Sequence, residues 1–431
     1  MGAARAPLQE QLSLVVVTSE EGGQMKPSDF PRDAKFHDPT TPPFRDDEGV
    51  HHIFSYADVM SVLMNRDEAF SRDPAPWLPG TGPVHMAFDF MWMIEPFTLD
   101  GEAGRHDPLR RVVEPWFKLR AVGTMEPIIR DIMVQGINDV VAKGTGEVNV
   151  ATELCSRLSM RVICRLTGIE FEREQWMREK LDEFNQATWD NCPPQWDVQA
   201  YFWQLIAKRL ARPQDELLDI LVQAWTEGAI DDHELIGYLY GFSAAGTDTT
   251  GASLANTFTY LAEFDLLDYA RSIQGDEEAV GMLIEEILRF GTPFPMKPLY
   301  VCKDSQFGDL KVPAESVLGV WFAAANRDEA VNGGDADGAD PNLFDPKRSP
   351  NKHIALGRGK HYCLGKDLAK LEMKILLEES LRRLPELQMD ATKPFRRYGG
   401  IVDSVTDAHF TFDQEQAERI KAGEREPTPV A

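Results

Sequence analysis

The sequence predicts a mainly α-helical protein with a minor β region. Apolar residues recur at helical spacing over most of 107–290, and short strand-like runs separated by turn residues follow Thr292. With 431 residues, 43% of them apolar, the chain can bury a large core. We expect an N-terminal extension at 1–25 and one domain over 26–413. A flexible tail is expected at 414–431, because this charged segment lacks an apolar face.

The elements follow from local patterns taken in chain order. A strand is expected at 51–54, before a helix around Val59 and Leu63, and the Pro- and Gly-rich segment 71–98 is a long loop. Further along the chain we expect a helix start at 105–111, a long helix over 232–264, a helix through 283–290, strands at 299–301, 307–312 and 317–321, an acidic glycine-rich loop at 331–340 and a helix after Cys363.

Charge and composition exclude several classes of partner. The formal net charge of −25 argues against nucleic acid and anionic membranes. No segment has the ~20 consecutive apolar residues that a membrane-spanning helix needs. The five cysteines include no C-x-x-C pair and are typical of reduced thiols. We therefore expect a cytoplasmic protein.

One short run places a cysteine between glycines, directly before a helix. It reads Leu356-Gly-Arg-Gly-Lys-His-Tyr-Cys363-Leu-Gly365. A thiolate at Cys363 would face the backbone N–H groups of a helix N-terminus, which stabilise negative charge. Gly357, Gly359 and Gly365 permit positive φ and a close approach of a flat ligand. The alternative is a buried, inert thiol, which is the usual state of a lone cysteine near glycines.

This run resembles the haem-binding loop of the cytochrome P-450 family, usually F-G-x-G-x-H/R-x-C-x-G. The resemblance covers about residues 45–412 and implies the cytochrome P-450 fold with haem b (iron protoporphyrin IX). It makes Cys363 the iron ligand, places Gly357 and Gly365 beside the haem, and lets His361 reach a propionate. Leu356 departs from the family's usual Phe, which packs against the thiolate side.

A polar motif interrupts the long apolar helix, at Ala244-Ala-Gly-Thr-Asp248-Thr249-Thr250. By itself it could be a polar patch whose hydroxyls bond back to the helix. Gly246 costs about 1 kcal/mol in a helix interior, which suggests that something lies close to it. The family has [AG]-G-x-[DE]-T here, so the resemblance places Ala245 against the haem. It makes Asp248 and Thr249 the catalytic pair that assists protonation during O–O cleavage.

Glu286 and Arg289 have E-x-x-R spacing, which puts both side chains on one helix face. An isolated pair of this kind is usually an unremarkable surface ion pair, but its neighbours here are apolar. In the family the pair stabilises a core beside the haem loop, with a third partner from a later Arg. Arg327, in Asn326-Arg327-Asp328, is our candidate, and these three residues are structural.

A basic helix start resembles the family's H-x-x-x-R, which binds the haem propionates. His106 and Arg110 are four residues apart and would point at the same anionic group. A solvated basic helix start is the alternative. The family often has a further propionate-binding Arg near the position of Leu299, and Lys297 is a candidate substitute.

Between Lys347 and Lys374 there are eight Lys or Arg residues and only two acidic ones, in a chain that is strongly acidic overall. Lys366, Lys370 and Lys374 are spaced four apart and share one helix face beside the cysteine loop. We interpret them as a docking face for an acidic electron donor, a ferredoxin that is reduced by ferredoxin reductase.

The predicted function is that of a haem-thiolate monooxygenase that oxidises a mainly apolar small molecule with O2. Aromatic and polycyclic compounds are candidates, and family habit suggests secondary metabolism. The alternatives are peroxide-driven or non-monooxygenase haem-thiolate chemistry, and a non-catalytic haem- or ligand-binding protein. Substrate-pocket candidates are Met and aromatic residues in three segments: Met86, Phe88, Phe90, Trp92, Trp189, Phe294 and Met296.

Overall fold

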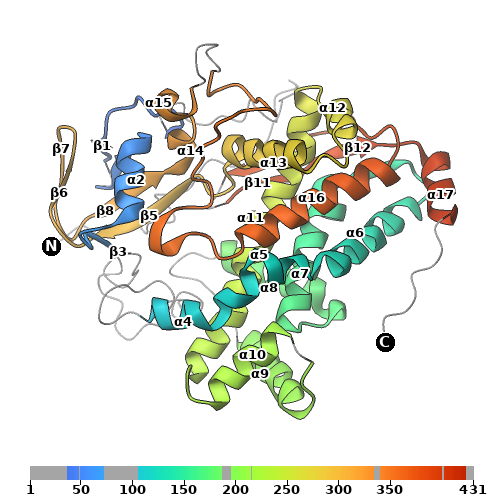
Figure 1. The fold of residues 1–431 in the computed structure, drawn as a ribbon, viewed down its shortest axis with the longest axis horizontal. Coiled ribbons are helices and arrows are strands. Elements are labelled where there is room, and N and C mark those ends of the chain that lie inside the picture. The colour runs from blue at the N-terminus through green and yellow to red at the C-terminus, as the bar shows by residue number, and fades with distance from the viewer. Residues whose placement is uncertain are drawn as a thin grey trace.

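The computed structural model describes residues 36–47, 49–71, 105–186, 196–214, 216–333, 340–399 and 402–423. Helices fill most of the molecule and a small sheet region lies at one side, next to α2 (Tyr56–Met64), as Figure 1 shows. The prediction of a mainly helical fold with a minor sheet is confirmed. The expected extension at 1–25, the loop over 72–98 and the glycine-rich turn at 334–339 lie outside the described residues.

Helical segments run through the chain from residue 56 to residue 423. They are α2, α4 (His106–Val113), η5 (Glu114–Phe117), α5 (Leu119–Gly123), α6 (Glu126–Val141), η6 (Val150–Cys155), α7 (Ser156–Thr167), η7 (Phe171–Arg173), α8 (Glu174–Gln186), α9 (Trp196–Ala211), α10 (Leu217–Thr226), α11 (Asp232–Glu263), α12 (Leu267–Ser272), α13 (Glu277–Gly291), α14 (Phe322–Ala325), α15 (Glu329–Asn332), η8 (Gly359–His361), α16 (Lys366–Arg383) and α17 (Gln414–Gly423).

Strands pair into one larger sheet and smaller ladders within the described residues. The larger sheet has the order β1-β2-β8-β5-β3, with β2 and β8 parallel and the other neighbours antiparallel. The strands are β1 (Phe44–Arg45), β2 (His51–Ile53), β3 (Phe70–Ser71), β4 (Glu147–Asn149), β5 (Met296–Val301), β6 (Ser305–Phe307), β7 (Leu310–Val312), β8 (Val317–Trp321), β9 (Gln388–Met389), β10 (Arg396–Gly399), β11 (Asp403–Asp407) and β12 (His409–Thr411).

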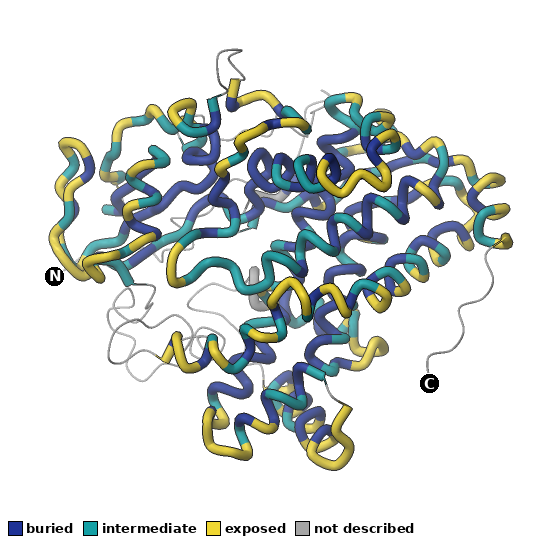
Figure 2. Tube along the Cα trace, viewed as in Figure 1, coloured by how far each residue is buried: buried dark blue, intermediate teal, exposed yellow. Residues whose placement is uncertain are grey.

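Helix α11 is the central element of the helical part and is 32 residues long. Asp231 caps its start by accepting from the Glu234 N–H at 2.8 Å, and Glu234 accepts from the Asp231 N–H at 3.0 Å. Its second half is buried on nearly all sides, against α7, α13 and α16 (Figure 2). A helix that is buried around its circumference needs no amphipathic stripe. The hydroxyls in its buried part bond back to the helix, as those of Ser253, Thr257 and Thr259 do.

Residues 414–423, which the sequence assigned to a flexible tail, form helix α17. Its Gln414 side chain donates to the Val141 carbonyl at 2.8 Å, and Lys421 donates to the Asn138 carbonyl at 3.0 Å. Both acceptors are in the last turn of α6, where backbone carbonyls lack partners within the helix. The prediction is therefore wrong for these ten residues, because polar contacts hold the helix where an apolar face is missing. None of the described helices is long and apolar enough to cross a membrane.

Candidate active site

The loop before α16 folds back on itself, so that Cys363 at its end lies next to Leu356 at its beginning. The Cys363 N–H donates to the Leu356 carbonyl at 2.9 Å, and the Tyr362 N–H donates to Gly359 at 3.1 Å. Gly357 and Gly359 have φ of +72° and +71°, as predicted. Gly365 differs: its φ is −83°, so positive φ does not explain this glycine. A Cβ there would meet no other atom within 4 Å, so a flat group can approach the backbone at Gly365.

The surroundings of the Cys363 thiol suit a metal-bound thiolate. Burial raises the pKa of Cys363, whereas the Gly365 N–H, Arg110 and Lys366 lower it by favouring the anion. On balance burial raises the pKa of Cys363, as it does for the fully buried Cys155 and Cys164, but Cys363 is partly exposed and has these anion-stabilising neighbours. Leu356 packs against the edge of the main apolar core, so the residue that departs from the expected Phe retains an apolar packing role.

The predicted anion-binding residues converge from two distant segments. The ring centroids of His106, at the start of α4, and His361, in η8, lie 4.2 Å apart. Arg110 donates from Nη1 to the Tyr362 carbonyl at 2.9 Å, which ties α4 to the cysteine loop. Burial lowers the pKa of His106, although its Nδ1 lies 2.8 Å from Asp107. Leu299 is buried in the sheet core, and the nearby Lys297 is partly buried on β5.

The predicted catalytic pair, Asp248 and Thr249, lies near the middle of α11, where the helix has an accessible face. Ala245 is exposed, although Ser243 and Thr247 on either side of it are buried. Thr249 Oγ1 donates to the Ala245 carbonyl at 2.7 Å, the back-bond that a helical threonine can make. Asp182 of α8 is within electrostatic reach of Asp248: desolvation raises the pKa of Asp182, Arg178 lowers it, and the negative charge of Asp248 raises it. The structure thus brings a second carboxyl, which sequence reasoning missed, to this part of α11.

Gly246 has a different explanation from the one expected. A Cβ at this position would lie 2.2 Å from Ile163 Cδ1 of α7. The residue is therefore small because two helices pack closely there, and no ligand is needed to explain it.

The Glu286–Arg289 pair is completely buried and forms the predicted structural core. Arg289 donates through Nε and Nη2 to the two oxygens of Glu286, each at 2.7 Å. The third arginine is Arg348, whose Nε lies 3.3 Å from Glu286, and the prediction of Arg327 is wrong. Arg327 is buried nearby and donates to the carbonyls of Ala323 and Phe290, at 3.1 and 2.8 Å. No local motif marks Arg348, because its partner is 62 residues earlier.

The three lysines of α16 are each paired with a carboxylate. Lys366 pairs with Asp367 at 2.6 Å, Lys370 pairs with Glu285, and Lys374 pairs with Glu277 at 2.6 Å. Glu277 and Glu285 come from α13, far from the lysines in sequence. The predicted face is therefore not an unopposed positive surface, because counting charges along the chain missed the helix packed beside it.

Two of the predicted substrate-pocket residues are in the described region. Met296 is buried in a small cluster with Phe54 and Trp321, and Phe294 packs against the sheet's apolar core. Their role in a pocket stays a prediction. Met86, Phe88, Phe90, Trp92 and Trp189 lie outside the described residues.

Comparison with known proteins identifies the family of this chain. A model of the family "Cytochrome P450" matches residues 278–399. The chain is 30% identical over 306 residues to cytochrome P450 107B1 of Saccharopolyspora erythraea, which spans 69% of the chain and 72% of that relative. The chain belongs to the cytochrome P450 family. Erythromycin C-12 hydroxylase of the same organism is 29% identical over 366 residues, covering 81% of this P450 and 85% of the hydroxylase.

The solved structures show the same fold. A mutant of P450 EryK in complex with erythromycin B matches this P450 with a TM-score of 0.73 and 26% identity, over 86% of this chain and 93% of that one. This P450 is a monooxygenase with haem b as its cofactor. The residues present fit that cofactor: a thiol with anion-stabilising neighbours, a glycine with space beside it, and a His and an Arg that converge on the cysteine loop.

Proposed function

We propose that this P450 oxidises a mainly apolar intermediate of secondary metabolism, with O2 and with electrons from a ferredoxin. Its likeness over most of its length to erythromycin C-12 hydroxylase supports hydroxylation of a large natural product. Aromatic and polycyclic compounds remain candidate substrates. When bound, haem supplies oxygen activation and C–H oxidation, and the protein provides ligation, orientation and protons.

Each site residue has a separate role in this proposal. Cys363 would hold the iron, and His106, Arg110 and His361 would hold the propionates, because the Arg110 cation and the two imidazoles gather at the edge of the cysteine loop. Gly357, Gly365 and Ala245 leave room for the macrocycle.

The observation that carries the catalytic proposal is the place of Asp248 and Thr249 near the middle of α11, on the same stretch as the exposed Ala245. A carboxyl group at position 248 can accept a proton and pass it on toward the reaction site. Thr249 lies next to Asp248 and positions its hydroxyl in the helix groove through the Ala245 carbonyl. These residues therefore move and hold protons, and the electrons come from outside the chain.

The proposal can be tested with a matched pair of threonine variants. Thr257 makes the same back-bond as Thr249, to the Ser253 carbonyl at 3.0 Å, but it is fully buried two turns later in α11. Thr249→Val should lower product formed per NAD(P)H consumed by about tenfold or more, with hydrogen peroxide released instead. Thr257→Val should leave this ratio unchanged.

The measurement is product yield, NAD(P)H consumption and peroxide release in a system reconstituted with ferredoxin and ferredoxin reductase. Equal coupling in Thr249→Val and the unaltered protein would contradict the role given to Thr249. Product formation from added peroxide alone, with no dependence on the donor, would favour the peroxide-driven alternative. Substrate candidates are screened by the spin-state change of the haem.

A further inference from the structure

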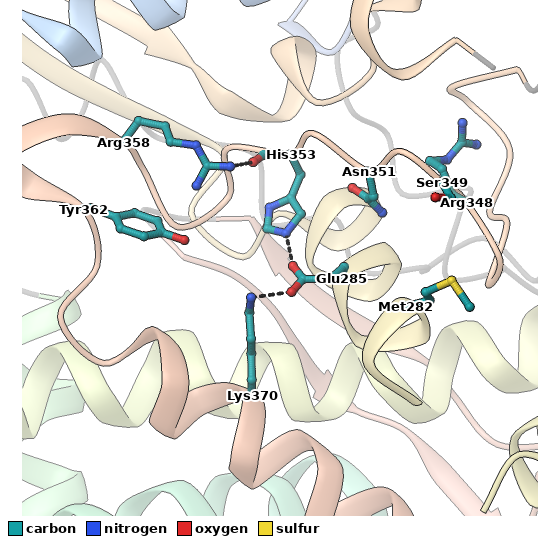
Figure 3. Close-up of a pocket in the computed structure, with 9 residues that line it drawn as sticks. All are labelled: Met282, Glu285, Arg348, Ser349, Asn351, His353, Arg358, Tyr362 and Lys370. Carbon is teal, nitrogen blue, oxygen red and sulfur yellow. Dashed lines mark hydrogen bonds and ion pairs between the residues drawn. The ribbon is translucent and has the colours of Figure 1, made fainter. Parts of the chain in front are cut away.

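A polar cavity of about 370 Å³ lies between α13, α16 and the segment that leads into the cysteine loop (Figure 3). The side chains that face it are mostly charged or polar, so the cavity does not suit an apolar substrate. Pockets for small molecules have volumes of about 300–1,000 Å³, so the space fits a small organic molecule better than a single ion.

The one carboxylate of the cavity wall is already matched by donors. Lys370 donates to Glu285 Oε1, and Glu285 Oε2 lies 2.6 Å from Nε2 of His353. Nδ1 of His353 accepts from the Ala355 N–H at 3.2 Å, so the ring's proton is on Nε2 and points at Glu285. Burial lowers the pKa of His353, so its ring adds no charge to the wall at neutral pH.

Arg358 is the cation of the wall that no carboxylate balances. Its Nη2 donates to the His353 carbonyl at 2.9 Å, and its guanidinium carbon lies 5.1 Å from the centre of the Tyr362 ring. No carboxylate among the described residues pairs with it. A guanidinium has five N–H donors in a planar fork that fits a carboxylate, so most of its donor capacity is available at the cavity.

Arg348 adds positive charge from behind the wall. It shares the Glu286 carboxylate with Arg289, at 3.3 and 2.7 Å, so two cations face one anion. The other donors of Arg348 reach backbone carbonyls, so this residue contributes charge and not hydrogen bonds. Together with Arg358 it makes the surroundings of the cavity positive, in a chain whose net charge is −25. Such a local reversal of charge attracts anions.

The wall also has an acceptor without a donor. Nδ2 of Asn351 donates to Glu286 at 3.0 Å, which fixes the orientation of the amide. The Oδ1 atom is buried and has no hydrogen-bond partner among the described residues. In Figure 3 this oxygen is on the side of Asn351 that faces His353 and the cavity. A buried acceptor without a donor is destabilising, so a ligand that donates a hydrogen bond to it is favoured.

We propose that this cavity binds a small hydroxy-acid anion with two or more carboxylates. A carboxylate of the ligand accepts from Arg358, and its hydroxyl donates to Asn351 Oδ1. Asn351 precedes the cysteine loop and Arg358 lies within it, so the ligand joins these two segments. Binding needs neither substrate nor electron donor, and it raises the stability of the folded protein by mass action.

The probe is citrate, which has three carboxylates and one hydroxyl. It is titrated into the haem-loaded protein at constant ionic strength, and calorimetry gives the stoichiometry and Kd. We expect saturable binding at one site per chain, with a higher melting temperature when citrate is present. Propane-1,2,3-tricarboxylate is citrate without the hydroxyl, and its Kd should be several-fold higher because Asn351 Oδ1 then lacks its donor. Sulfate should not bind saturably.

Two variants with opposite expected effects locate the site. Arg358→Gln removes the unbalanced cation and should raise the Kd of citrate by about tenfold, the usual effect of losing a charge-assisted hydrogen bond. Glu285→Gln removes the one negative charge of the wall and leaves the Lys370 ammonium available to the ligand. It should therefore lower the Kd several-fold.

The matched control is Lys374→Gln, one turn further along α16, whose lysine pairs with Glu277 outside the cavity. It changes the net charge of the chain by the same amount as Arg358→Gln, and its Kd should equal that of the unaltered protein. The carbon-monoxide spectrum of each reduced variant reports intact thiolate ligation. If Arg358→Gln does not retain that spectrum, Glu285→Gln still decides the question.

Absence of saturable citrate binding by the unaltered protein would overturn the proposal. An unchanged Kd in Arg358→Gln, or weaker binding in Glu285→Gln, would place the anion elsewhere and overturn it as well. Equal affinity for citrate, propane-1,2,3-tricarboxylate and sulfate would show attraction of any anion, with no site that recognises the hydroxyl.

Discussion

Two adjacent glutamates on α13 point in different directions and have different environments. Glu286 is completely buried and accepts from Arg289, Arg348, the Asn351 amide and the Asp345 N–H. Glu285 is 34% exposed and has two partners, Lys370 and His353, at the edge of a cavity. One carboxylate holds distant segments together, whereas the other borders a cavity.

The difference shows how burial decides what an ion pair does. A buried carboxylate that loses a partner leaves an uncompensated charge, so the network around Glu286 stabilises the fold as a unit. A partly exposed pair contributes little stability because water screens it. The Glu285 side of α13 can therefore change its charge without loss of the fold.

The largest effect is expected from Glu286→Gln. This change removes the charge that balances Arg289 and Arg348, both of them buried. We expect unfolding free energy to fall by about 3–5 kcal/mol, and haem incorporation to fall with it. Urea unfolding, followed by tryptophan fluorescence, measures the unfolding free energy. The carbon-monoxide spectrum of the reduced protein measures haem incorporation. A loss below about 1 kcal/mol would contradict the structural role of Glu286.

A double-mutant cycle tests whether Arg348 or Arg327 is the third partner of the Glu286–Arg289 pair. Arg348→Met and Arg327→Met each replace a buried arginine by an apolar chain of similar length, and both should be destabilising. Coupling with Glu286→Gln should be about 1–3 kcal/mol for Arg348 and within about 0.5 kcal/mol for Arg327. Larger coupling for Arg327 would restore the assignment made from the sequence.

Glu285→Gln should lower the unfolding free energy by about 1–2 kcal/mol, clearly less than the neighbouring Glu286→Gln, because this carboxylate is partly exposed and water screens its pairs. Its Lys370 partner is 28% exposed and can be solvated after the change. The same urea series provides the measurement. A loss comparable to that of Glu286→Gln would remove the distinction between the two faces of α13.

Local patterns in the sequence predicted the elements that carry this site. They did not predict which residues far apart in the chain contact one another. The Glu286–Arg289 spacing, the cysteine loop and the extent of α11 follow from neighbours along the chain. Arg348 could not be recognised in this way, and neither could the pairing of Lys374 with Glu277, 97 residues away. Gly246 shows the same limit, because the Ile163 side chain that requires it belongs to another helix.

Glu372 is a third kind of carboxyl: it is buried like Glu286, but one of its oxygens has no hydrogen-bond donor among the described residues. It is 2% exposed on α16, and no donor among the described residues reaches its Oε2. Burial raises its pKa well above the ordinary value, so the folded protein holds a proton that the unfolded chain releases. The contribution of the Glu372 carboxyl to the unfolding free energy is therefore complete below about pH 4.5, and it falls as pH rises toward the folded-state pKa.

Glu372→Gln should have the same melting temperature as the unaltered protein in acid. At pH 7–8 its melting temperature should be higher, by a few degrees at most, as measured by thermal unfolding across this range. A lower melting temperature for Glu372→Gln at pH 8 would mean that the ionised carboxylate has a stabilising partner.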